Sequence, residues 1–184
     1  MSINPNDNNG SIREGLVAAL MAYLFWGVFP IYFKIIDVVP SEEVFAHRIF
    51  WSVPFGLLIL YLSKQLGELW QVLLNKKKII YLALTSILIS INWYIYILAV
   101  QTDEILQASL GYYINPLMYV LVGILFLGEK LRTGQIIAIL IAAIGVLILT
   151  LSAGKLPWIS ISLATSFTLY GVMRKKIEVS AMVG

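Results

Sequence analysis

Six apolar blocks of about twenty residues each run through this chain, and they constrain its fold more than any other feature. An α-helix needs roughly twenty apolar residues to cross about 30 Å of hydrocarbon. The blocks cover residues 15–36, 43–62, 79–100, 105–127, 134–152 and 157–173. Apolar residues make up 60% of the chain and charged residues only 12%, outside the range of soluble domains. We therefore predict an all-α fold, a polytopic helical bundle in the lipid bilayer.

Several other protein classes are excluded by the residues present. A membrane β-barrel would alternate apolar and polar residues, and "IIAILIAAIGVLIL" (136–149) shows no alternation. The chain has no cysteine and a single histidine, His47, so we expect no disulfide, no metal site and no other cofactor. No serine lies in a glycine-flanked nucleophile motif, so we expect no catalytic residues and no enzyme.

The lysine and arginine residues gather on one side of the predicted spans. Ten of the thirteen lie there: Arg13, Lys64, Lys76, Lys77, Lys78, Lys130, Arg132, Arg174, Lys175 and Lys176. Because cytoplasmic loops are enriched in these residues, the distribution predicts a cytoplasmic N-terminus. Residues 1–14 are then a short polar cytoplasmic tail, without the basic region of a signal peptide. The net charge of +3 follows from this topology, and we expect no nucleic-acid partner.

Two short segments in the first and sixth blocks resemble each other. "AYLFWGV" (22–28) returns as "SFTLYGV" (166–172), with aromatic, glycine and valine positions in register. The first copy would run outward and the second inward, which is the pattern of an inverted-topology repeat in transporters. The alternative is chance, since membrane segments resemble one another by composition. A repeat would divide the chain into a five-helix unit, 15–152, and the first helix of a second, incomplete unit, 153–184.

The fourth block carries polar groups and a helix breaker, "LGYYINPLMYV" (110–120). Tyr112 and Asn115 share a helical face, and Pro116 frees the backbone carbonyl of Tyr112. One interpretation is a bent helix that presents an amide and hydroxyl groups to a substrate. The other is that Asn115 forms hydrogen bonds between helices while the tyrosines pack. This segment alone favours neither.

The first and third blocks favour the substrate interpretation. Asn92 and Tyr96 share a face of the third block, and Tyr23, Trp26 and Pro30 share a face of the first. Polar atoms in hydrocarbon are costly unless they are paired or face a cavity. We therefore expect an aromatic, amide-lined cavity in the middle of the membrane, with Pro30 and Pro116 as helix bends.

His47 and Arg48 lie one turn inside the outer end of the second block. Together they could handle protons or attract an anion. The alternative is that Arg48 extends to the outer interface and pairs with Glu43 or Asp37, while His47 packs against a neighbouring helix.

"SLGYYINPLMYVLVGILFLGEKL" (109–131) closely resembles the fourth helix of EamA-domain proteins in the drug/metabolite transporter superfamily, and more narrowly of the RarD family. Four further segments match that family in order: "AYLFWGVFPIYFK" (22–34), "AHRIFWS" (46–52), "NWYIYILAV" (92–100) and "LYGVMRKK" (169–176). The resemblance implies ten helices in two inverted five-helix repeats, forming a secondary carrier in the bacterial cytoplasmic (inner) membrane. This chain departs from that pattern in length, since its apolar blocks end with the sixth.

Two functions are therefore expected. The main hypothesis is a transporter of small molecules such as metabolites, amino acids or drugs. Substrate would then contact Tyr23, Trp26, Asn92, Tyr96, Tyr112 and Asn115. The alternative is a truncated or non-transporting half-unit or scaffold that pairs with a second copy or a complementary half. In that case the small-residue stripe Ala138, Ala142 and Gly145 would mediate association.

Overall fold

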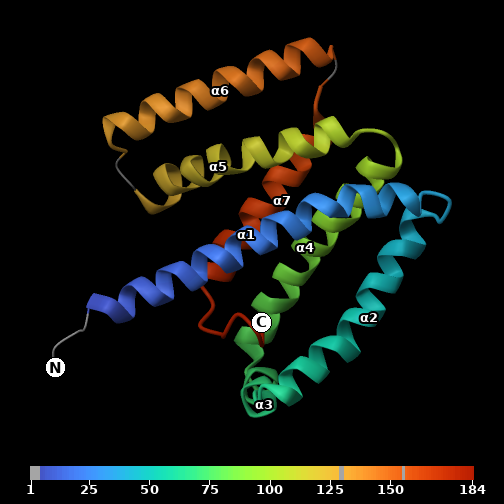
Figure 1. The fold of residues 1–184 in the computed structure, drawn as a ribbon, viewed down its shortest axis with the longest axis vertical. Helices are drawn as coiled ribbons and strands as arrows, with labels where there is room; N and C mark the ends of the chain where they lie inside the picture. Colours follow the sequence, from blue (N-terminus) through green and yellow to red (C-terminus); the bar gives the residue numbers. More distant parts are fainter. Residues whose placement is uncertain (1–4, 129–130, 155) are drawn as a thin grey trace. The chain divides into compact units, whose positions relative to one another are not determined.

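The computed structural model describes residues 5–128, 131–154 and 156–184, and in these segments the chain forms seven α-helices and no strand (Figure 1). The helices are α1 (Pro5–Ile35), α2 (Ser41–Leu62), α3 (Leu66–Leu74), α4 (Lys76–Gln101), α5 (Ile105–Leu127), α6 (Thr133–Ala153) and α7 (Trp158–Lys175). The all-α prediction is confirmed. The chain divides into two compact units, Met1–Val38 with α1 and Val39–Gly184 with the other helices, and each is described by itself.

Among the described residues, five helices are long and apolar enough to cross a membrane: α1 from Gly15, α2, α4, α5 up to Leu125, and α6 up to Ser152. They coincide with five of the six apolar blocks. Helix α1 begins at Pro5, ten residues before its block, so most of the segment expected as a tail is helical. Proline suits a first helical position because its missing N–H has no partner to find there. Residues 1–4, Lys130 and Lys155 lie outside the described residues.

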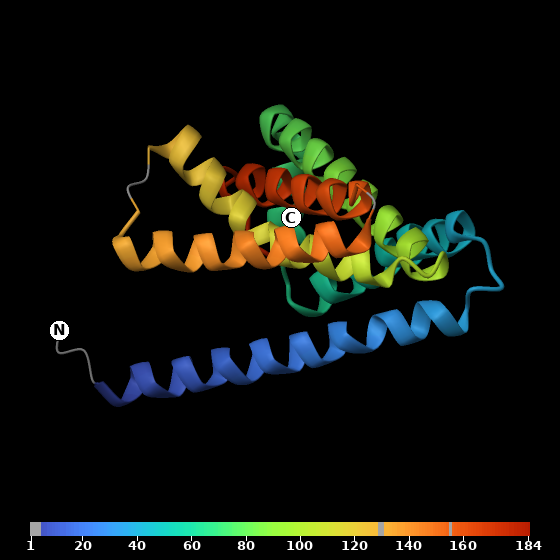
Figure 2. The same ribbon diagram turned by 90° about the horizontal axis from the view of Figure 1, so that it is seen from above.

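The sixth block forms α7, but this helix is not among the five apolar candidates. Its sequence contains five serine and threonine residues: Ser160, Ser162, Thr165, Ser166 and Thr168. The reason for this composition is its position, because α7 packs extensively along both α4 and α5 (Figures 1 and 2). A helix enclosed by other helices can bond its hydroxyl groups to protein instead of exposing them to lipid.

Helix α6 is the opposite case. It is apolar on all sides, and no residue of its candidate span is buried, although it lies beside α5. Large aliphatic side chains such as Leu140, Ile141 and Ile144 are exposed. So much exposed apolar surface is unfavourable in water and favourable in hydrocarbon. The protein is therefore a multi-pass membrane protein whose helices contact the lipid bilayer.

The contact between α5 and α7 depends on glycine. A Cβ atom at Gly111 would lie 3.1 Å from Leu163 Cβ and 3.1 Å from the carbonyl oxygen of Ser160. Gly171 lies on α7, and the side chain of Tyr119 from α5 fills the space that a side chain at Gly171 would need. Gly171 is the glycine of "SFTLYGV", the second copy of the repeated segment. Small residues at helix crossings let two backbones approach closely in a membrane.

We expect Gly111→Val to separate α5 from α7 and to lower the free energy of unfolding by roughly 1–3 kcal/mol, a typical cost of overpacking. The matched control is Gly145→Val on α6, where a Cβ atom meets nothing within 4 Å. Thermal unfolding in detergent would compare the two variants. Equal losses of stability would contradict the close packing of α5 on α7.

Candidate functional site

Asn92 on α4 faces α7. Its side chain is 6% exposed, and its amide nitrogen donates to the carbonyl oxygen of Leu163 at 2.8 Å and to Ser166 Oγ at 2.9 Å. Ser166 Oγ in turn donates to the carbonyl oxygen of Ser162 at 2.7 Å. The amide nitrogen of Asn92 is therefore fully used in joining α4 to α7.

Asn115 on α5 faces the same helix. Its side chain is 8% exposed, and its Oδ1 accepts a hydrogen bond of 2.9 Å from Thr168 Oγ1. In the part of the chain that the structure describes, Asn115 Nδ2 and Asn92 Oδ1 make no hydrogen bond. Each amide thus holds α7 with one polar atom and keeps the other available.

Two further hydrogen bonds extend this polar seam along α7. Ser160 Oγ donates to the backbone oxygen of Gln107 at 2.6 Å, and Tyr119 Oη donates to the backbone oxygen of Phe167 at 3.3 Å. We use the name α7 seam for the hydrogen bonds made by Asn92, Asn115, Gln107 and Tyr119 with Leu163, Ser166, Thr168, Ser160 and Phe167. The hydroxyl residues of this seam were missed by sequence reasoning, although their number in an otherwise apolar block was a signal.

The predicted tyrosines also meet. The rings of Tyr96 on α4 and Tyr112 on α5 lie edge to face, 6.1 Å between centroids, and Trp93 contacts Tyr96 in the same way at 5.8 Å. Tyr96 is buried, while Tyr112 is 53% exposed. Four of the six predicted substrate residues therefore lie on the paired helices α4 and α5. Pro116 lies inside α5, which remains helical across it.

The other two predicted substrate residues lie on α1. The rings of Tyr23 and Trp26 meet edge to face at 5.7 Å, and Pro30 follows within the same helix. Helix α1 belongs to the Met1–Val38 unit, so the expected association of these side chains with α4 and α5 stays a prediction.

The His47–Arg48 pair lies near the start of α2. His47 Nε2 is 3.9 Å from Glu43 Oε1, and both side chains are exposed. The guanidinium carbon of Arg48 lies 3.7 Å from the centroid of the Trp93 ring, a cation–π geometry. Asp37, one of the partners expected for Arg48, pairs with Lys34 at 3.2 Å. Trp93 therefore connects Arg48 to the aromatic cluster of Tyr96 and Tyr112.

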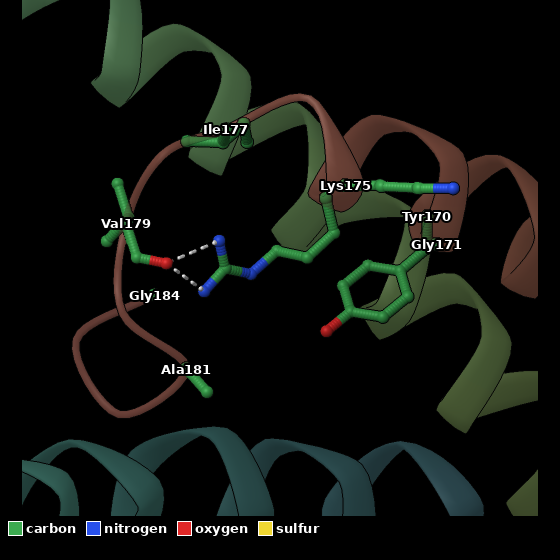
Figure 3. A pocket seen from close by; sticks show the side chains of 8 residues that line it. Tyr170, Gly171, Lys175, Ile177, Val179, Ala181 and Gly184 are labelled. Carbon is green, nitrogen blue, oxygen red and sulfur yellow. Dashed lines mark hydrogen bonds between the residues drawn. The ribbon is translucent and has the colours of Figure 1, made fainter. Parts of the chain in front are cut away.

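Two hollows lie at the C-terminal end of α7, beyond the α7 seam. One of about 560 Å³ is lined by Tyr170, Gly171, Arg174, Lys175, Ile177, Val179, Ala181 and Gly184 (Figure 3). Arg174 does not point into open space there, because its guanidinium donates to the backbone oxygens of Val179 and, at 3.0 Å, Ser180. The second, of about 240 Å³, lies between the start of α4 and the segment after α7. Neither is lined by a predicted substrate residue.

Comparison with known proteins agrees with a transporter. Residues 13–151 match the EamA-like transporter family. The chain is 45% identical over 172 residues to Protein RarD of Salmonella typhi and 44% identical over 175 residues to the uncharacterized transporter YojE of Bacillus subtilis. It is 31% identical over 175 residues to the chloramphenicol-sensitive protein RarD of Pseudomonas aeruginosa.

These alignments cover 94%, 94% and 93% of this chain but only 58%, 59% and 58% of the respective relatives, so the chain spans less than two thirds of their length. No solved structure matches it. The polytopic helical fold, the match over residues 13–151 and the identity to RarD proteins lead to one conclusion: the chain belongs to the EamA-like transporter family, in its RarD branch.

Proposed function

We propose that this chain acts as a secondary transporter of small molecules such as metabolites, amino acids or drugs. It would work in the bacterial cytoplasmic membrane, with its N-terminus in the cytoplasm. The observation that carries the proposal is the match of residues 13–151 to a family of transporters. The bacterial origin of the RarD relatives supports the membrane, and the distribution of lysine and arginine supports the orientation.

The substrate would bind where α4 and α5 meet α7. Asn92 Oδ1 is available as an acceptor and Asn115 Nδ2 as a donor, beside the rings of Tyr96 and Tyr112. These groups favour a molecule with an apolar or aromatic body that carries both a hydrogen-bond donor and an acceptor. Tyr23 and Trp26 of α1 would cover the apolar part of the substrate. One relative is named for sensitivity to chloramphenicol, so this drug is a reasonable first probe.

Transport requires that the site open to each side of the membrane in turn. If α7 begins a second, inverted repeat, the α7 seam lies at the boundary between the repeats, where such carriers bind their substrates. Rocking of α7 against α4 and α5 would exchange seam hydrogen bonds for bonds to the substrate. Pro30 and Pro116 would serve as bends. The exposed side chain of His47, 3.9 Å from Glu43, would exchange a proton. Alternatively, His47 and Arg48 together would attract an anion.

The second candidate is a non-transporting half-unit or scaffold. The observation that favours it is the surface of α6, because no residue of its candidate span is buried. The exposed small-residue stripe of Ala138, Ala142 and Gly145 on α6 would then receive a second copy or a complementary half. Reconstitution of the purified chain in proteoliposomes separates the two functions, because only the transporter would exchange a labelled ligand across the bilayer.

We expect Asn115→Ala to weaken binding of a ligand found by thermal-shift screening, starting with chloramphenicol. The loss should be roughly fivefold per folded molecule, since one hydrogen bond contributes about 1 kcal/mol. Thr168→Val is the matched control, because it removes the interhelical bond and leaves Asn115 Nδ2 in place. Both variants should lose roughly 0.5–1.5 kcal/mol of unfolding free energy. Calorimetric titration of both would measure the difference, and equal weakening would assign Asn115 to folding alone.

The absence of cysteine makes the orientation directly measurable. We expect Thr102→Cys, after α4, to react with a membrane-impermeant maleimide in intact cells. Lys77→Cys, at the start of the same helix, should react only after the cells are permeabilised. Both positions are exposed, so accessibility of the side chain is matched. The reverse pattern of labelling would place the N-terminus outside.

A further inference from the structure

Basic residues gather at one end of the α4–α7 pair. Lys76, Lys77 and Lys78 form the first turn of α4, and Arg174 and Lys175 end α7, followed by Lys176. These two runs lie about a hundred residues apart in sequence, and the packing of α7 on α4 brings them together. A hydrogen bond of 2.9 Å from Lys78 Nζ to the backbone oxygen of Glu178 joins them directly.

The hollow of about 240 Å³ lies between these runs. It is lined by Asn75, Lys77, Lys78, Tyr81, Lys176, Ile177 and Glu178. Three ammonium groups and one carboxylate thus surround it. The side chains of Lys77 and Lys176 are exposed, and neither forms an ion pair within the described residues. The hollow has a surplus of positive charge that nothing in the described chain neutralises.

The first turn of α4 is an unfavourable place for three lysines. The N-terminus of a helix carries a partial positive charge, so cations there repel it. The Asn75 side chain satisfies the backbone N–H of Lys78 at 3.1 Å, but no acidic residue lies in this turn. An anion in the hollow would relieve this repulsion and accept hydrogen bonds from the lysines.

We propose that this hollow binds the phosphate of an anionic phospholipid headgroup, such as that of phosphatidylglycerol. The surroundings favour a lipid over a free anion, because exposed Ile80 and Leu84 continue from the hollow along the apolar span of α4. Tyr81 lines the hollow, and tyrosine is enriched where a membrane meets water. Basic pockets between helices at this level of a membrane bind phosphate headgroups. With the Glu178 carboxylate counted, the lining keeps an excess of positive charge, which attracts a phosphodiester anion.

The test is native mass spectrometry of the purified full chain with equimolar phosphatidylglycerol and phosphatidylcholine. We expect phosphatidylglycerol adducts to exceed phosphatidylcholine adducts by roughly tenfold. The double variant K77Q/K176Q should lower phosphatidylglycerol retention by roughly fivefold for each lysine removed. The control K64Q/R13Q changes the charge equally at exposed positions outside the hollow, and retention should stay within about twofold.

Three results would overturn the proposal. The wild-type chain could retain both lipids equally, or the two double variants could lose equally, in which case general charge attraction is responsible. Millimolar inorganic phosphate could also displace phosphatidylglycerol with the same dependence on Lys77 and Lys176, in which case the ligand is a soluble phosphate. Circular dichroism would verify folding. Retention of phosphatidylglycerol by the wild-type chain at rising salt is a further test that needs no variant. It should fall steeply, because ionic strength screens binding to a lysine cluster.

Discussion

The absence of water in hydrocarbon is the constraint on which this structure depends. A polar group in the middle of a membrane must find a partner within the protein. Each polar group left without a hydrogen bond there costs on the order of several kcal/mol. The Asn92 nitrogen and the Asn115 oxygen meet this requirement by bonding to α7, and the hydroxyl groups of Ser160, Ser166 and Thr168 meet it through the same contacts with α4 and α5. The α7 seam therefore fixes three helices in one arrangement, whereas in α6 the hydroxyl group of Thr150 donates within its own helix, to the backbone oxygen of Val146 at 2.8 Å.

The apolar blocks of the sequence were sufficient to predict the helices, because length and hydropathy are properties of one segment. Asn92 and Asn115 could be identified for the same reason, since a lone amide in an apolar block is conspicuous. Their partners Ser166 and Thr168 could not, because which faces of two helices meet depends on packing that one segment does not encode. The lower hydropathy of α7 is also explained by packing, because α7 lies against α4 and α5. The partner of Arg48 was expected among acidic residues, and the Trp93 ring now provides a contact that charge reasoning did not consider.

The proposed roles divide the α4–α7 pair by position along its length. Its middle carries the Asn92 amide and the Tyr96 ring, beside Asn115 and Tyr112 of α5, and this arrangement suits a small molecule. Its basic end carries a surplus of lysines, which suits an anionic headgroup. A lipid held at that end would join the start of α4 to the segment after α7, so the two sites would lie on the same pair of helices.

The composition of α7 also bears on how the protein is made. A helix with five serine and threonine residues partitions into lipid less readily than its neighbours, because each polar group opposes the transfer. Chains are synthesised from the N-terminus, so α4 and α5 reach the membrane before α7 does. The amides of Asn92 and Asn115 are then already in place when the hydroxyl groups arrive. Insertion of α7 thus depends on helices that precede it, and its stable entry into the membrane is a step of tertiary folding.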